Sequence, residues 1–115
     1  MNKKEISVRH PYFLLLKSGE KKVEGRLYDA FFRDLKQGDI LTFIDESTAE
    51  KLKTEVEKID VFANFAQMIS FFHKEILGFG QFSEEDTLKT YNSFYTEEEI
   101  KEYGVCGVTV KTIGD

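Results

Sequence analysis

The sequence predicts an α+β fold in which a small mixed β-sheet is curled and accompanied by helices. Only about five segments have the composition of strands, and helical segments fall between them without the regular alternation of a doubly wound sheet. The run over residues 51–62 changes its alternation part-way, which is typical of a β-bulge that bends a sheet towards a barrel. At 115 residues, with no repeat or linker, residues 1–115 are expected to form a single domain.

The N-terminal segment predicts a strand followed by a helix. Ile6 and Val8 alternate with polar neighbours, as in a short strand. Pro11 then stands where a helix begins, because proline is well tolerated in the first turn. Residues 12–16 would form the largely buried part of this helix, and Gly19 would end it by adopting a positive φ.

The next strand, over residues 22–27, is unusual because one of its faces is charged. Lys22, Glu24 and Arg26 stand at alternate positions, so their side chains share that face, while apolar residues point to the other. Lys21 comes just before the strand. Such a strand is either an edge in contact with solvent, where charge pairs contribute little, or one wall of a polar cleft.

Three further elements are predicted in the centre of the chain. Asp29 can cap a short helix over residues 30–35, and Gly38 supplies the permissive backbone of the following turn, in which Asp39 bonds to local backbone. Residues 40–44 form a buried strand, followed by a polar loop and the long strand at 51–62.

The C-terminal half predicts three helices and a last strand. A helix is expected over residues 64–77, capped by its asparagine, and a second over residues 83–94. Thr96 and Glu99 have the spacing of a capping box that begins the last helix. Residues 105–113 are apolar enough to lie in the centre of the sheet.

Composition and charge exclude several classes of protein. The net charge of −5 argues against a protein that coats nucleic acid by bulk electrostatics. Residues 1–44 nevertheless contain nine Lys or Arg against six Asp or Glu, so the basic part suits a confined polar or anionic ligand. The single cysteine, Cys106, lies in an apolar run and is expected to be buried. With no secretory signal or membrane segment, a cytoplasmic location is expected.

No cofactor or metal is expected either. His10 and His73 are the only histidines, and no Cys/His cluster has the spacing of a metal site.

Two stretches resemble a known family, the ASCH domain (activating signal cointegrator homology) of the PUA-like superfamily. The string SGEKKVEGRLYD, followed by LKQGDILTF, is similar to the family's Lys-x-x-Glu-x-Arg signature and Gly-Asp turn; here the signature is Lys21, Glu24 and Arg26. The closing stretch FYTEEEIKEYGVCGVTV resembles the family's C-terminal end. The resemblance implies a small, curled, mixed β-barrel of PUA type, with helices covering the barrel openings and a cleft lined by the signature residues.

Members of the family are generally regarded as RNA- or nucleotide-binding modules. One bacterial branch hydrolyses N-acetylated cytidine nucleosides with a Lys, a Thr and a Glu. Lys21 matches that lysine, but Glu24 stands where the branch has threonine. The separate glutamate has no clear counterpart, and Glu84 or Glu85 lies in the corresponding region.

The three signature residues fit either binding or catalysis. A desolvated lysine can act as a base or nucleophile, and a neighbouring carboxylate can move a proton. Arg26 can hold a phosphate or stabilise an oxyanion. The same groups can simply bind a nucleotide, because Lys and Arg pair with phosphate and Glu accepts from an exocyclic amine.

Five other residues are weaker candidates. Tyr91 and Tyr95 are four positions apart and either belong to the core or stack a base, and Tyr12 is equally ambiguous. Arg9 and Arg33 either extend a basic rim or are solvated surface charges.

The first hypothesis is therefore a module that binds RNA or a modified nucleoside or nucleotide, with Lys21, Glu24, Arg26, Tyr95, Tyr91 and Arg9 as ligand-binding residues. One alternative is a small hydrolase of an N-acylated cytidine nucleoside, with Lys21 and Glu24 catalytic. Another is a protein-interaction domain whose cleft is vestigial.

Overall fold

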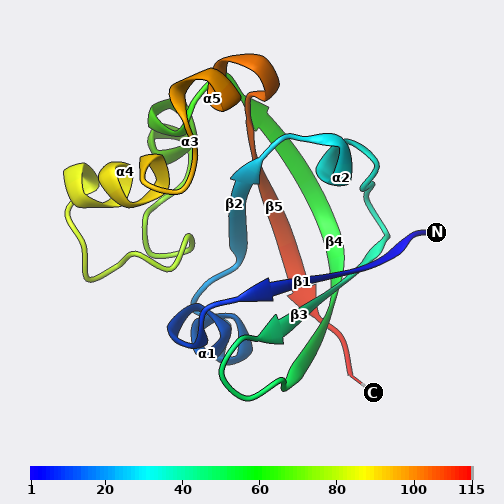
Figure 1. Ribbon diagram of the computed structural model, residues 1–115. Coiled ribbons are helices and arrows are strands. Elements are labelled where there is room, and N and C mark those ends of the chain that lie inside the picture. The colour runs from blue at the N-terminus through cyan, green and yellow to red at the C-terminus, as the bar shows by residue number, and fades with distance from the viewer. Residues whose placement is uncertain (115) are drawn as a thin grey trace.

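A computed structural model describes residues 1–114 and contains a curled sheet and five helices (Figure 1). The strands are β1 (Lys3–Val8), β2 (Val23–Leu27), β3 (Ile40–Asp45), β4 (Lys51–Phe62) and β5 (Val105–Thr112). The helices are α1 (His10–Ser18), α2 (Ala30–Arg33), α3 (Phe65–Phe71), α4 (Glu84–Asn92) and α5 (Glu97–Tyr103).

The five strands form one mixed sheet in the order β1-β3-β4-β5-β2. Only the β1–β3 pair is parallel, and the other three pairs are antiparallel. The sheet curls into a half-barrel, so that its two edge strands, β1 and β2, approach each other without forming a ladder. The predicted α+β class, with a small curled mixed sheet, is confirmed.

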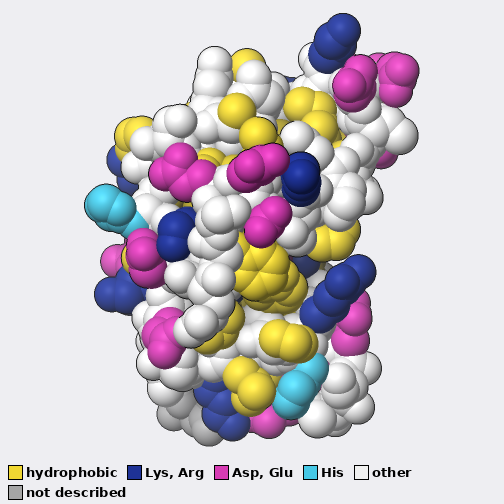
Figure 2. All heavy atoms as spheres, turned by 90° about the vertical axis from the view of Figure 1, so that its left-hand side faces the viewer, with side chains coloured by type: hydrophobic (Ala, Val, Ile, Leu, Met, Phe, Trp, Pro, Cys, Tyr) yellow, Lys and Arg dark blue, Asp and Glu magenta, His cyan; other side chains and the backbone are white. Residues whose placement is uncertain are grey.

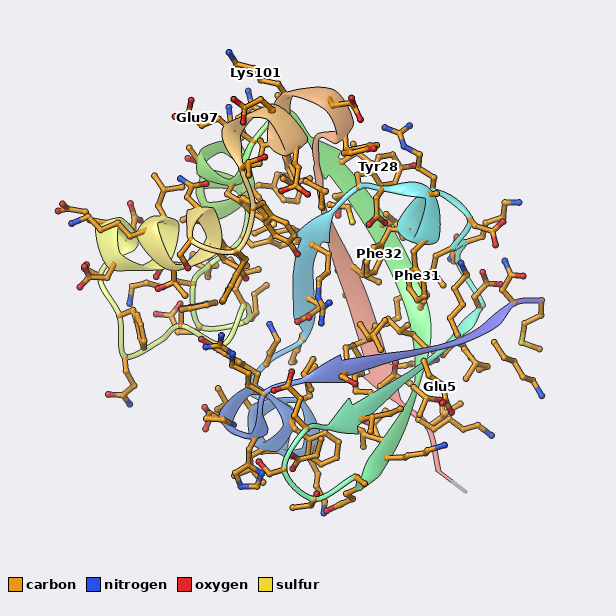
Figure 3. All side chains as sticks on the ribbon, in the orientation of Figure 1. Glu5, Tyr28, Phe31, Phe32, Glu97 and Lys101 are labelled. Carbon is orange, nitrogen blue, oxygen red and sulfur yellow. The ribbon has the colours of Figure 1, made fainter. Side chains whose placement is uncertain are left out.

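Two hydrophobic cores lie on opposite faces of the sheet. The first fills the concave side, where Phe13 of α1 and Phe32 of α2 pack against β3, β4 and β5. Figure 3 shows Phe31 and Phe32 on the side of α2 that faces the sheet. The second core is rich in aromatic residues and lies where α3 and α4 cover the other face of β2 and β5; Phe65 and Tyr91 belong to it. The seam between β1 and β2 is therefore bordered by both cores.

Several local predictions are confirmed. The register between β4 and β5 shifts between Val56 and Lys58, which is the expected bulge. The capping box of Thr96 and Glu99 is present at the start of α5. Gly19 ends α1 with φ = 89°, in the left-handed region that favours glycine.

The helix expected over residues 64–77 is shorter than predicted. Asn64 caps it, but α3 ends at Phe71 because Phe72 adopts an extended conformation. The Phe72 ring then packs over Gly107 of β5, where a side chain on the glycine would overlap it. Phe72 therefore contributes to the sheet–helix contact rather than to a longer helix.

Two expectations near the N-terminus are also corrected. The segment 12–16 is not buried throughout: Leu14 is 49% exposed, because only one face of α1 contacts the sheet. Strand β2 begins at Val23, so Lys22 lies outside it and its side chain is exposed.

Over the described residues 1–114, no helix combines the length and the apolar composition needed to cross a bilayer. Cys106 is buried, as expected, and burial raises the pKa of its thiol to about 12.

Candidate ligand-binding cleft

A cleft of about 340 Å³ opens beside β2, between the end of β1, the start of α1 and the segment after α4. Its volume is in the range of small-molecule sites. It is lined by Ser7, Val8, Arg9, Tyr12, Lys21, Glu24, Gly25, Arg26, Glu46, Phe79, Tyr91, Phe94 and Tyr95. Figure 2 views the molecule from the side of α4 and shows hydrophobic side chains exposed in the middle of this face, with acidic side chains above them.

Lys21 is held at one end of the cleft with its ammonium group fully engaged. The side chain is almost completely buried, with the residue 3% exposed. Nζ donates to the carbonyl oxygens of Val23 at 2.9 Å and Leu77 at 2.7 Å, and lies 3.1 Å from Oε1 of Glu24. Three acceptors around one nitrogen match the three donors of a charged lysine.

Glu24 and Arg26 lie on the same face of β2, opposite Val108 and Cys106 of β5. Nε of Arg26 donates to Oε2 of Glu24 at 2.6 Å, so each carboxylate oxygen of Glu24 contacts one cation. Nη2 of Arg26 donates to the carbonyl oxygen of Ser7 at 3.0 Å. Arg26 thus links the two edge strands across the seam of the half-barrel.

The three groups, called the ion triad below, depend on one another electrostatically. Burial by itself raises the pKa of Glu24, but the charges of Lys21 and Arg26 and their hydrogen bonds outweigh it, so that the pKa is lowered. Burial lowers the pKa of Lys21, and the attraction of Glu24 offsets only part of this effect. Glu24 is therefore an anion whose charge is already balanced within the protein.

Aromatic side chains form the other walls of the cleft. Tyr12 of α1 contacts Phe79 with a ring distance of 5.4 Å. At the mouth, the guanidinium of Arg9 lies 5.3 Å from the centre of the Phe94 ring, and Phe94 is 43% exposed. Tyr95 stacks on a buried phenylalanine of α3. These rings offer the flat apolar surfaces on which a planar ligand stacks.

Tyr91 lies deeper in the wall and has a distinctive hydroxyl group. Only 4% of the residue is exposed, and its hydroxyl oxygen is the one buried side-chain polar atom within residues 1–114 that lacks a hydrogen-bond partner. The ring is seated against Gly25, where a Cβ would lie 2.8 Å from Cε1 of Tyr91 and 2.8 Å from Cε of Met68. The absence of a side chain on Gly25 therefore makes room for Tyr91.

All six candidate ligand-binding residues line this cleft, namely Lys21, Glu24, Arg26, Tyr95, Tyr91 and Arg9. Tyr12 lines it too. Arg33 does not: it donates to the carbonyl oxygens of Tyr28 and Tyr103 and stabilises the α2 region. Glu84 and Glu85 are exposed in the first turn of α4 and contribute nothing to the cleft.

Sequence reasoning missed part of the lining. Glu46 is the second carboxylate at the cleft, and it follows directly on the end of β3. Phe79 lies in a segment whose sequence is generic, Phe94 begins the C-terminal stretch without any pattern that marks it as a site residue, and Gly25 has no side chain to mark it. A signal for Gly25 existed, since a glycine inside a strand often marks a close approach of another group.

The histidines lie outside the cleft. Nδ1 of His10 is 2.6 Å from Oδ2 of Asp45, whose other oxygen accepts from the Ser47 amide. Among residues 1–114, no group of three or more His, Cys, Asp or Glu side chains could hold a metal ion.

Comparison with known families agrees with this architecture. The sequence matches the ASCH domain over residues 6–113. The chain belongs to the ASCH domain family. No protein with a curated description matches it.

Solved structures support the same fold for this ASCH domain. It is similar to the crystal structure of hypothetical protein PH0355, with a TM-score of 0.87 and 38% identity over 97% of this chain and 100% of that one. It also resembles protein PF0455 from Pyrococcus furiosus, solved by NMR, with a TM-score of 0.73, 32% identity and 100% coverage of both chains. An ASCH domain from Lactobacillus crispatus shares the fold at 11% identity, with a TM-score of 0.64 over 96% of this chain and 79% of that one.

Proposed function

We propose that this ASCH domain binds a nucleobase, presented by a free nucleoside or nucleotide or by an unpaired position in RNA. The observation that supports the proposal is the cleft itself, which places aromatic side chains next to a preformed and largely buried ion triad. Its volume of about 340 Å³ suits one ligand of nucleoside size rather than several stacked bases. Members of the ASCH family are expected to bind RNA or nucleotides, which agrees with this use of the cleft.

Charge favours a short ligand over a long strand. The chain has a net charge of −5, and three acidic residues begin each of the helices α4 and α5. An extended RNA backbone on this face would meet repulsion, because binding of RNA strands depends strongly on basic surfaces. Arg9 at the mouth is a cation available to a single phosphate group.

The geometry supports binding more than hydrolysis. A hydrolase of N-acylated cytidine would need a group free to attack or to accept a proton. All three Nζ donors of Lys21 have acceptors, and both oxygens of Glu24 contact cations. Neither group is in a state to act as a base without first leaving its partners.

Thermal unfolding with candidate ligands tests the proposal. The four ribonucleosides, their 5′-monophosphates and a short single-stranded RNA are each added at millimolar concentration, and the Tm is recorded. At least one nucleoside is expected to raise the Tm, and the RNA is expected to bind no more tightly than the matching mononucleotide. The control is Lys101→Ala, since Lys101 lies on the exposed side of α5 and should leave binding unchanged (Figure 3).

The contrary outcomes are equally clear. If none of these ligands changes the Tm or the NMR spectrum, the binding proposal is wrong, and an interaction domain with an unused cleft becomes the better explanation. Release of acetate from N4-acetylcytidine, abolished by Lys21→Met, would instead establish the hydrolase.

A further inference from the structure

The free edge of β2 presents the backbone N–H and C=O of Gly25 to the cleft. In an antiparallel ladder, successive residues turn their N–H and C=O alternately towards and away from the partner strand. The amide of Val110 in β5 donates to the carbonyl oxygen of Lys22. By the alternation of the ladder, the backbone N–H and C=O of Glu24 and Arg26 also point towards β5. The N–H and C=O of Gly25 therefore point to the open edge.

The backbone groups of Val23 also point away from β5, as the alternation requires, but they already have hydrogen-bond partners. Its N–H donates to the carbonyl oxygen of Ile76, and its C=O accepts from Nζ of Lys21, so both groups are used outside the ladder. At the other end, the Tyr95 hydroxyl lies beside the Leu27 backbone. Gly25 therefore lies between Val23, whose N–H and C=O are both used, and Leu27, which the Tyr95 hydroxyl approaches.

A single residue with free backbone groups is too short an edge to bind an added peptide strand. Strand addition uses a row of unpaired backbone groups along an edge. A single N–H and C=O can instead pair with a compact planar group whose acceptor and donor are neighbouring atoms, such as the lactam edge of uracil or the amidine edge of cytosine. Nucleobases offer this pattern on their pairing edges.

The Tyr91 hydroxyl provides a third polar contact at the same place. Its ring lies against Gly25, and the oxygen is buried without a partner. Native proteins leave few buried polar atoms unsatisfied, and within the described residues this hydroxyl is the one left available to a ligand atom. Burial, reinforced by the charge of Glu24, raises the pKa of Tyr91 well above its ordinary value, so the hydroxyl stays protonated and can donate.

We propose that the uncharged groups at Gly25 and Tyr91 read the pairing edge of one nucleobase, with the backbone N–H and C=O of Gly25 as donor and acceptor and the Tyr91 hydroxyl as an additional donor. The inference rests on the proposed function and goes further, because it names the ligand atoms that are recognised. It assigns the selection of the base to Gly25 and Tyr91 rather than to the ion triad. Removing the donor from that edge should therefore weaken binding even though the ring remains.

NMR on ¹⁵N-labelled protein gives the direct test. Titration with uridine and cytidine should move the Gly25 amide resonance in a saturable way. 3-Methyluridine and N4,N4-dimethylcytidine, which lack the donor on the pairing edge, should bind about tenfold more weakly than their parents, as expected for the loss of one buried hydrogen bond.

The variant Tyr91→Phe separates a ligand contact from a structural one. It keeps the ring against Gly25 and removes only the hydroxyl, so affinity for the better nucleoside should fall about tenfold. The Tm of the free protein should stay equal or rise, because an unsatisfied buried hydroxyl is removed. Tyr103→Phe, on α5 and outside the cleft, is the matched control and should change neither quantity.

The possible failures are distinguishable. If nucleosides bind while Tyr91→Phe and donor methylation leave the affinity unchanged, this inference is wrong and the proposed function stands. A lower Tm for free Tyr91→Phe would show that the hydroxyl serves the fold, which also overturns the inference. If no nucleoside binds at all, both proposals are overturned together.

Discussion

The charged residues of the cleft and its uncharged polar groups differ in how far the protein itself uses them. Lys21, Glu24 and Arg26 are bound to one another and to backbone carbonyls at distances between 2.6 and 3.1 Å. The Tyr91 hydroxyl has no partner, and the Gly25 peptide faces the free edge of β2. The charges therefore hold the walls in place, whereas the neutral groups remain available to a ligand.

The physical reason for this division is the cost of burying charge. An unpaired charge in a buried site loses its hydration, so each member of the ion triad must be matched within the protein. A neutral hydroxyl or peptide group loses less when it lacks a partner. A site that must stay open between binding events can therefore keep neutral groups in reserve more readily than charged ones.

The largest expected effect comes from removing the anion of the ion triad. Glu24→Gln keeps the shape of the side chain but leaves the buried Lys21 and the partly buried Arg26 as neighbouring unpaired cations, and we expect a loss of about 3–5 kcal/mol in the free energy of unfolding. Urea denaturation at pH 7 measures it. Glu46→Gln, at an exposed carboxylate of the same cleft, should change stability by less than about 0.5 kcal/mol. Similar losses for the two variants would show that the ion triad has no special role.

The second prediction concerns how the difference in stability between wild type and Glu24→Gln depends on pH. The pKa of Glu24 is lower in the folded protein than its unfolded value of about 4.3, so its stabilising contribution is present above that pH. It is lost as the pH falls through the folded pKa, where protonated Glu24 resembles glutamine. The stability gap between wild type and Glu24→Gln should therefore narrow as the pH is lowered below about 4. A gap that stays constant between pH 7 and pH 3 would contradict this.

A substitution at Gly25, one of the neutral groups of the cleft, should have an intermediate effect on the free energy of unfolding. Gly25→Ala places a Cβ 2.8 Å from both Tyr91 and Met68, so one of them must move, at a cost of about 1–3 kcal/mol. Gly80→Ala is the matched control, because its Cβ would meet Glu75 only at 3.4 Å. Chemical denaturation of the two variants measures the difference. If Gly25→Ala is as stable as Gly80→Ala, the Tyr91 ring is not seated as described.

Sequence patterns were sufficient for the fold because the signals are local. The capping box at Thr96, the bulge after Val56 and the end of α1 at Gly19 each follow from a few neighbouring residues. The prediction of a helix beyond Phe71 is wrong because the conformation of this segment depends on the contact between Phe72 and Gly107, which are far apart in the sequence. Local periodicity cannot report such a contact.

The candidate site was predictable only in part for the same reason. Lys21, Glu24 and Arg26 are close in sequence, so their juxtaposition follows from one strand and the residues before it. The alternation predicts Lys22 on the charged face, but the strand begins one residue later, and Lys21 rather than Lys22 lines the cleft. Glu46 and Phe94 join the lining only through the curl of the sheet and the position of the segment after α4.

The smallest effect on stability and binding is expected for Arg9, at the mouth of the cleft, which belongs neither to the ion triad nor to the neutral polar groups. Arg9 is a charged residue that, unlike the ion triad, contacts an exposed aromatic ring, so Arg9→Ala should change stability by less than about 0.5 kcal/mol. It should weaken binding of uridine 5′-monophosphate about two- to fivefold at low salt and leave uridine unaffected, because a rim charge interacts with phosphate across screened solvent. Calorimetric titrations at low and high salt, with Lys101→Ala as the control, measure both effects. An equal loss for uridine would mean that Arg9 contacts the base, and the separation between a charged rim and a neutral reading site would no longer hold.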